Sequence, residues 1–110
     1  MARVLVVDDD AEQLDVRCML LQRAGHVVIA AESAAAALDS FREQRPEVVV
    51  MDLRLPRVTD GEDLLREIAP QARVVVLTGT RLDATPPGAV RVLSKPCSSR
   101  VLLRTIDELA

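Results

Sequence analysis

Two groups of acidic residues stand directly after apolar runs of the sequence. Residues 4–10 read VLVVDDD, which places Asp8, Asp9 and Asp10 side by side, and residues 48–52 read VVVMD, which ends in Asp52. Carboxylates this close together disfavour mutual ionisation unless something positive lies nearby. Carboxylate oxygens that converge in a shallow cleft suit a hard cation such as Mg²⁺, with Mn²⁺ as an alternative. The two groups therefore predict a cation site.

A threonine and a lysine also follow apolar runs. Thr78 ends the run VVVLT, and Ser94 and Lys95 follow VRVL. A lysine supplies a point charge for a carboxylate or phosphate oxygen, and a carboxylate can attack phosphorus to form an aspartyl phosphate. Phosphoryl transfer needs mainly positioning and charge neutralisation, so a small site can support it. Together these residue types indicate phosphoryl chemistry assisted by a metal ion.

Several of these residues also have a simpler interpretation. Asp10 fits the cap of a following helix, where its charge favours the helix N-terminus. Thr78 alone indicates a local hydrogen bond, and Lys95 before a proline alone indicates a solvated side chain. His26 follows Gly25 and is the only histidine, so we expect it at the surface. The functional interpretation depends on the whole set occurring in order.

The elements that must position these residues follow from hydrophobic periodicity. Five β-branched runs are predicted as strands, at 3–7, 27–30, 48–51, 73–77 and 90–93. Most are apolar without alternation, which is typical of strands buried on both faces of a parallel sheet. Helical patterns cover 11–24, run from Ser33 towards Pro46, and begin near Gly61 and near Ser98 or Ser99. The residues expected to face inward are Ala11, Leu14, Cys18 and Leu21; Ala34, Leu38 and Phe41; Leu64, Leu65 and Ile68; and Leu102, Ile106 and Leu109.

Strands that alternate with helices predict one α/β domain over residues 1–110 with a doubly wound parallel sheet. In such a sheet ligands bind beyond the carboxyl ends of the strands, so the polar residues above should share one edge. The pattern breaks between the last two strands, where Pro86 and Pro87 stand in tandem. Neither proline fits a helix interior, and we expect the helix of that segment to be shortened or missing.

The composition argues against several other classes. The net charge is −3 and the basic residues are scattered, which argues against direct nucleic-acid binding. No apolar run approaches the roughly 18 residues of a membrane span, and no signal-peptide pattern is present. Cys18 and Cys97 stand far apart and outside any CxxC pattern, so we expect free thiols in a reducing compartment. A cytoplasmic protein is therefore expected.

The motifs VLVVDDD, VVVMDLRLP, VVVLTG and VLSKP, in this order, resemble the response-regulator receiver domain, the CheY-like module of two-component signalling. The resemblance covers essentially the whole chain. Each motif alone is weak, but the ordered set is specific. It implies a flavodoxin-like fold with five parallel strands in the order 2-1-3-4-5.

The resemblance also implies a metal site and a phosphoacceptor. Asp52 would receive the phosphoryl group from a phosphohistidine of a sensor histidine kinase or phosphotransfer protein. Asp8 and Asp9 would hold Mg²⁺ together with Asp52 and the backbone carbonyl of Arg54.

Two further residues and the partners follow from the same resemblance. Thr78 would reorient to bond the phosphoryl group, and Lys95 would pair with an acceptor oxygen. The domain would not be an enzyme in the usual sense, although it would catalyse its own phosphorylation and dephosphorylation. It would switch an output domain or effector protein, and it could form a weak homodimer.

Two departures from the family pattern bear on the output. Val92 stands where the family usually has an aromatic residue that turns inward on activation. The interval between Thr78 and Lys95 leaves too little room for an ordinary helix of about 11–12 residues, and that helix normally helps to form the output and dimer face. Neither departure removes a residue of the predicted site.

Two other functions stay open at this point. One is a pseudo-receiver, a protein-interaction module that does not rely on phosphate, which Val92 and the double proline favour. The other is an enzyme, because Asp8 and Asp10 resemble the nucleophile motif of haloacid-dehalogenase-type phosphatases. Those enzymes usually continue with Thr or Val, whereas Ala11 and Glu12 follow here.

Overall fold

The structure is a computed structural model that describes residues 2–79, 82 and 84–110. Within these residues the strands are β1 (Arg3–Val7), β2 (Val27–Ala31), β3 (Val48–Asp52), β4 (Arg73–Thr78) and β5 (Ala89–Ser94). The helices are α1 (Ala11–Arg23), α2 (Ala34–Gln44), α3 (Val58–Ile68) and α4 (Ser99–Leu109). All predicted strands and helices are therefore present.

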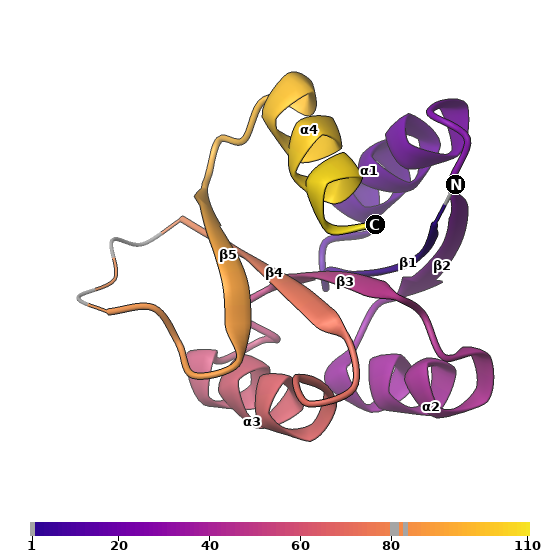
Figure 1. The fold of residues 1–110 in the computed structure, drawn as a ribbon. Helices are drawn as coiled ribbons and strands as arrows, with labels where there is room; N and C mark the ends of the chain where they lie inside the picture. Colours follow the sequence, from indigo (N-terminus) through magenta and orange to yellow (C-terminus); the bar gives the residue numbers. More distant parts are fainter. Residues whose placement is uncertain (1, 80–81, 83) are drawn as a thin grey trace.

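The five strands form one parallel sheet with the order β2-β1-β3-β4-β5 (Figure 1). β1 lies between β2 and β3, and Leu5 pairs with Ile29 on one side and Val49 on the other. β4 lies between β3 and β5, which leaves β2 and β5 at the two edges. The predicted parallel sheet and strand order are confirmed.

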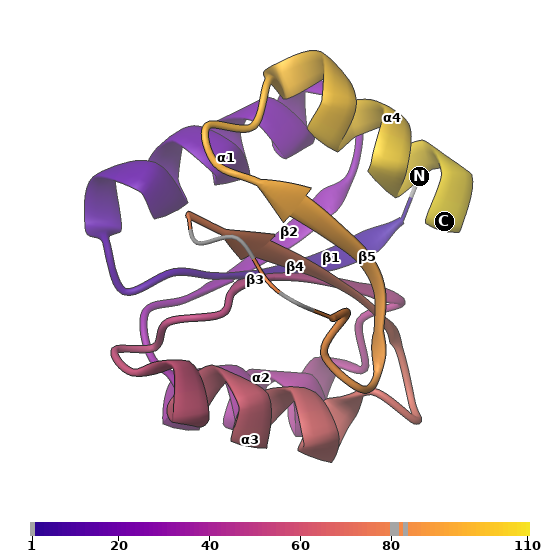
Figure 2. The same ribbon diagram turned by 90° about the vertical axis from the view of Figure 1, so that its left-hand side faces the viewer.

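The helices cover the sheet in two layers, with α1 and α4 on one face and α2 and α3 on the other (Figure 2). Successive side chains of a strand point to opposite faces, so β1 contributes to both layers. Val4 and Val6 pack with α1 and α4, whereas Leu5 and Val7 pack with α2 and α3. All four are at most 1% exposed. Burial on both faces explains the unbroken apolar run of this strand.

The ends of the helices follow local signals in the sequence. Asp10, Ser33 and Ser98 cap α1, α2 and α4, and each side chain accepts a hydrogen bond from a backbone N–H of the first turn. After α1, Gly25 has φ +96°, a left-handed conformation that ends a helix at little cost for glycine. None of the helices in the described part of the chain is long and apolar enough to cross a membrane.

Two predicted details of the helices are wrong. α3 begins at Val58 rather than near Gly61, because the Asp60 carboxylate accepts from the backbone N–H and the Nε of Arg57 and closes an earlier first turn. Ala11 is exposed rather than inward, since it is the first residue of α1 and precedes the part of the helix that packs on the sheet.

β5 is not buried on both faces, unlike the central strands. Its residues are exposed or half-buried along the whole strand, and Val90 is 41% exposed. The strand lies at the edge of the sheet, and the described residues of segment 79–88 form no helix that could cover it. Val92 is half-buried and packs on the α2 and α3 side of the core. The expected loss of the helix between β4 and β5 is confirmed for the described part of the chain.

His26 is buried, which corrects the expectation of a surface histidine. It is 8% exposed, and its Nδ1 accepts from the backbone N–H of Ala2 at 3.1 Å. The Nε2 atom lies 3.6 Å from the Asp107 carboxylate of α4. The pairing of β2 with β1 begins at Val27, whose N–H donates to the Ala2 carbonyl, so the residue before it must lie beside the start of β1. That position depends on strand pairing and has no local signal.

Candidate functional site

The acidic residues lie at the point of the sheet where the strand order reverses. The chain passes from β1 outward to β2 and then crosses back to β3 on the other side of β1. The connections after β1 and β3 therefore diverge and open a crevice at the carboxyl ends, which is where open α/β sheets bind ligands. Asp8 and Asp9 follow β1, and Asp52 is the last residue of β3.

Asp8, Asp9 and Asp52 together form the acidic cluster. Each offers one carboxylate oxygen, and these oxygens lie within 4.8 Å of one another. Asp8 is buried, Asp52 is half-buried and Asp9 is exposed, so the cluster opens to solvent on one side. Several carboxylate oxygens with an open side for water match the ligands that Mg²⁺ prefers. The donor set fits the metal that the sequence predicted.

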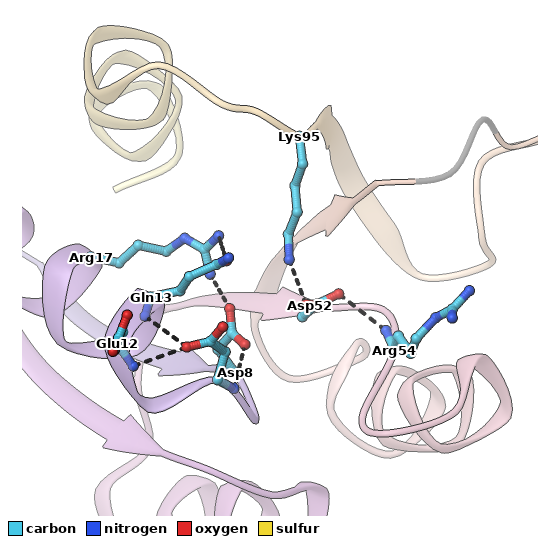
Figure 3. Close-up of polar contacts among 8 residues, drawn as sticks. Asp8, Glu12, Gln13, Arg17, Asp52, Arg54 and Lys95 are labelled. Atoms are coloured by element: carbon cyan, nitrogen blue, oxygen red, sulfur yellow. Dashed lines mark hydrogen bonds and ion pairs between the residues drawn. The ribbon is translucent and has the colours of Figure 1, made fainter.

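Two donors hold the Asp52 carboxylate (Figure 3). Lys95 Nζ donates to Oδ2 at 2.6 Å, and the backbone N–H of Arg54 donates to Oδ1 at 3.2 Å. The side chains of Asp52 and Lys95 are only 13% and 23% exposed, and a charge-assisted hydrogen bond of this kind is stronger than one between neutral groups. The side chain of Arg54 extends away from Asp52 (Figure 3). A ligand role for the Arg54 carbonyl stays a prediction.

Asp8 is held by α1 and by the residue that caps it. Its Oδ1 accepts from the backbone N–H of Asp10 at 2.9 Å, and its Oδ2 accepts from Arg17 Nη1 (Figure 3). Arg17 Nη2 also donates to Gln13 Oε1 at 3.0 Å. The carboxylate of Asp8 is 1% exposed, and a buried carboxylate needs such partners because its desolvation is costly. Asp8 therefore has its own counter-charge in the absence of a metal.

Asp10 is separate from the acidic cluster. Its Oδ1 accepts from the N–H groups of Glu12 and Gln13 at 3.0 and 3.3 Å, which are two of the unpaired donors at the start of α1. The prediction that Asp10 caps the helix is confirmed. The three adjacent acids of the sequence thus divide into two cluster members and one helix cap.

Thr78 and Lys95 come from the ends of the last two strands, at the same edge of the sheet as the acidic cluster. Thr78 ends β4 and is 6% exposed, and its carbonyl accepts from the backbone N–H of Lys95 at 2.8 Å. A hollow of about 390 Å³ lies beside them and is lined by Asp52, Leu53, Arg54, Val58, Thr78, Gly79, Leu82 and Lys95. The structure therefore brings all the predicted site residues to one edge, beside a space that can hold a small anionic group.

Sequence reasoning missed Arg17 and Gln13. A weak signal for them does exist, because residues three or four apart share one face of a helix. Counting from Asp10, Gln13 and Arg17 fall on one face, and that face of α1 is the one beside the end of β1. The signal says nothing about which acid Arg17 contacts, since that depends on how α1 packs.

The two cysteines are free, as expected. Burial raises the pKa of the Cys18 thiol, and the charge of Asp15 adds to this shift. Burial also raises the pKa of the Cys97 thiol, although the charge of Arg17 acts in the opposite direction. Shifts in this direction disfavour the thiolate, which is the nucleophilic form of cysteine.

Comparisons with known proteins agree with the fold. Residues 4–107 match the family model of the response regulator receiver domain. The chain is 30% identical to Protein PilH of Pseudomonas aeruginosa, over 97% of this chain and 96% of PilH. It is 32% identical to the transcriptional regulatory protein GlrR of Escherichia coli, over 97% of this chain but only 26% of GlrR.

A solved structure has the same fold. Response regulator protein TrrA of Thermotoga maritima, crystallised in complex with Mg(2+)-BeF, matches with a TM-score of 0.88 and 26% identity over 100% of both chains. The family model covers nearly the whole chain, and the sheet order and strand-end residues are those that the resemblance implied. This chain belongs to the response regulator receiver domains of two-component signalling.

Proposed function

We propose that this receiver domain accepts a phosphoryl group on Asp52 in a reaction that requires a divalent cation. The observation that carries the proposal is the position of Asp52, which lies between the Lys95 ammonium and the oxygens of Asp8 and Asp9. A carboxylate in this position can approach phosphorus because the cations around it offset the repulsion between two anions.

Three residues of the chain would have different roles in the phosphoryl transfer. An oxygen of Asp52 forms the bond to phosphorus while the bond to the donor nitrogen of a phosphohistidine breaks and the imidazole leaves with its proton. Lys95 holds the acceptor carboxylate and offsets the negative charge of the incoming group. Thr78 lines the same hollow, and its hydroxyl would donate to a phosphoryl oxygen.

Asp8, Asp9, Asp52 and the backbone carbonyl of Arg54 would hold the metal. Mg²⁺, or Mn²⁺ in its place, supplies positive charge to the transferring oxygens when bound. The acidic cluster supports this assignment, and the TrrA structure carries Mg²⁺ on the same fold.

The partners we propose are a sensor histidine kinase or phosphotransfer protein upstream and an output domain or effector protein downstream. Receiver domains interact with both kinds of partner, and the longer GlrR shows that such a domain can be part of a larger regulator. Two free thiols suit a reducing compartment, and we place the reaction in the cytoplasm. We also propose that the domain forms a weak homodimer.

The phosphorylation proposal is tested with a small phosphodonor. We expect acetyl phosphate with Mg²⁺ to add one phosphoryl group to the protein, as measured by intact mass, and EDTA to prevent it. Asp52→Asn should abolish the addition. Asp39→Asn removes an exposed acid from α2 and serves as the matched control that should behave as wild type. Phosphate that stays on the Asp52→Asn protein would refute the assignment.

The same variants separate the two alternatives. Val92 and the missing helix favour a pseudo-receiver, which would bind its partner equally with or without beryllofluoride as a phosphoryl mimic. The phosphatase alternative needs Asp10 as a free acid, and Asp10 instead accepts two hydrogen bonds from α1. We therefore propose a phosphoacceptor and not a turnover enzyme. Hydrolysis of a phosphate ester that is lost on Asp8→Asn and kept on Asp52→Asn would contradict this.

A further inference from the structure

Arg17 places a cation of the chain beside the acidic cluster. The residue lies on α1, and its guanidinium donates to Asp8 Oδ2 and to Gln13 Oε1 (Figure 3). The Arg17 side chain is 15% exposed and the Asp8 side chain 1%. The contact is therefore largely shielded from water, and ion pairs in such a position are screened less than exposed ones.

The two oxygens of Asp8 are both engaged in this arrangement. Oδ2 accepts from Arg17, and Oδ1 accepts from the backbone N–H of Asp10 at 2.9 Å. A metal ion bound by the cluster would have to share the lone pairs of Asp8 with these donors. The guanidinium thus competes with a metal for the most buried ligand of the set.

The balance of charge leads to the same conclusion. The acidic cluster has three carboxylates, and the chain itself places two cations against them, Arg17 and Lys95. A divalent metal adds two more positive charges to the same small space. With Arg17 in place the loaded site carries an excess of positive charge, and two cations separated by a few ångströms repel one another strongly when water is largely excluded.

The surroundings of Arg17 allow it to move aside. Arg17 and Gln13 of α1 line a hollow of about 590 Å³ whose other side includes Leu102 of α4 and Cys97 of the segment before it. The guanidinium therefore borders open space on the side of α4. We expect it to turn into this space when a metal takes its place on Asp8.

We infer that Arg17 is a tethered competitor of the divalent metal, a positioning residue that neutralises Asp8 in the metal-free protein and weakens Mg²⁺ binding at the acidic cluster. This inference rests on the proposed metal site, because it concerns the affinity of that site. It predicts that the Arg17–Asp8 contact and the bound metal exclude each other.

The test is the metal affinity of the unphosphorylated protein, measured without any phosphodonor. The chain has no Trp or Tyr, so Mg²⁺ binding is followed by isothermal titration calorimetry and Mn²⁺ binding by electron paramagnetic resonance. We expect Arg17→Gln to lower the Kd for both ions by at least about tenfold. Arg17→Lys keeps the charge and should stay closer to wild type. Arg23→Gln removes an exposed charge from the same helix and should leave the Kd unchanged.

Thermal unfolding is a second test, and it remains valid if Arg17→Gln is less stable than wild type. Arg17→Gln leaves the buried Asp8 carboxylate without its partner, so the metal-free variant should melt below wild type. Because the stabilisation by a ligand increases with the logarithm of [ligand]/Kd, the same saturating Mg²⁺ concentration should raise the Tm of Arg17→Gln more than that of wild type. An Asp8→Asn background should remove most of this difference.

The outcomes separate this inference from the proposed function. Equal Kd values and equal Mg²⁺-induced Tm shifts in wild type and Arg17→Gln would overturn the role of Arg17 and leave the proposed function standing. If neither protein binds Mg²⁺ or Mn²⁺, both the metal-dependent function and this inference are rejected. Binding that is detectable only in Arg17→Gln supports the inference in its strongest form.

Discussion

β1 and β5 each deliver a charged residue to the same site, and they do so from very different surroundings. β1 is central, and its last four residues are fully buried between two helical layers. β5 is an edge strand whose residues are exposed or half-buried, beside a segment with no helix in its described part. Asp8 thus stands at the end of a rigid support, whereas Lys95 comes from the least buried strand of the sheet.

The difference shows how Lys95 keeps its position although β5 is little buried. Lys95 is held by two bonds to its neighbours, the Nζ contact to Asp52 at 2.6 Å and the backbone bond to Thr78 at 2.8 Å. These two bonds fix it to the buried strands β3 and β4, so β5 needs little packing of its own. The loss of a helix at this edge can therefore alter an output surface without removing the chemistry.

The largest difference in stability that we expect is between a substitution in the central strand β1 and one in the edge strand β5. Leu5→Ala leaves a cavity in a fully buried strand and should lower the free energy of unfolding by about 2–5 kcal/mol, because Leu5 is 0% exposed. Val90→Ala on β5 removes a side chain that is 41% exposed and should cost about 0.5 kcal/mol or less. Urea unfolding followed by circular dichroism measures both. Similar losses for the two variants would contradict the comparison.

The next effect compares two glycines that follow β3 and β4. A Cβ on Gly61 would lie 1.7 Å from the Leu53 carbonyl oxygen, whereas no atom of the described residues beyond its chain neighbours lies within 4 Å of one on Gly79. Alanine usually favours a helix over glycine, yet we expect Gly61→Ala in α3 to lose about 1–3 kcal/mol because the backbone of Leu53 must move. Gly79→Ala should change stability by about 0.5 kcal/mol at most. A Gly61→Ala protein more stable than wild type would show that the close approach is not real.

A smaller effect compares the caps of the two helices that share one face. Asp10 accepts from two N–H groups of α1, whereas Ser98 accepts from one, that of Val101, in α4. Asp10→Ala should therefore cost about 1 kcal/mol and Ser98→Ala somewhat less. Asp10→Ser, which keeps a cap, should recover most of the loss. The midpoint of urea unfolding gives the ranking, and a larger loss at Ser98 would reverse it.

The smallest effect concerns pH and the start of α3. Hydrogen bonds from the side chain and backbone of Arg57 hold the pKa of Asp60 below its usual value. A carboxyl with a lowered pKa in the folded state stabilises the protein above its unfolded pKa of about 4 and loses this contribution as the pH falls. The urea midpoints of wild type and Asp60→Asn should therefore differ near pH 7 and converge below about pH 4. A gap that widens in acid would contradict this.

Much of the fold was predictable because it follows from local patterns. Unbroken β-branched runs indicated the central strands, and Asp10, Ser33 and Ser98 indicated three helix starts, since a short polar side chain can satisfy the first free N–H groups. The same reasoning failed at His26, because its burial depends on strand pairing and not on the neighbouring residues. It also gave no degree of burial for β5, which depends on which helices cover that edge of the sheet.

The sequence by itself determined which residues meet at the site. Asp8, Asp9, Asp52, Thr78 and Lys95 each end or follow a strand, and parallel strands bring their carboxyl ends to one edge. Only the tertiary structure decided how these residues are paired, with Lys95 on Asp52 and Arg17 on Asp8. The physical reason is that short-range periodicity shows where each strand ends, whereas side-chain partners depend on how α1 and the sheet pack against each other.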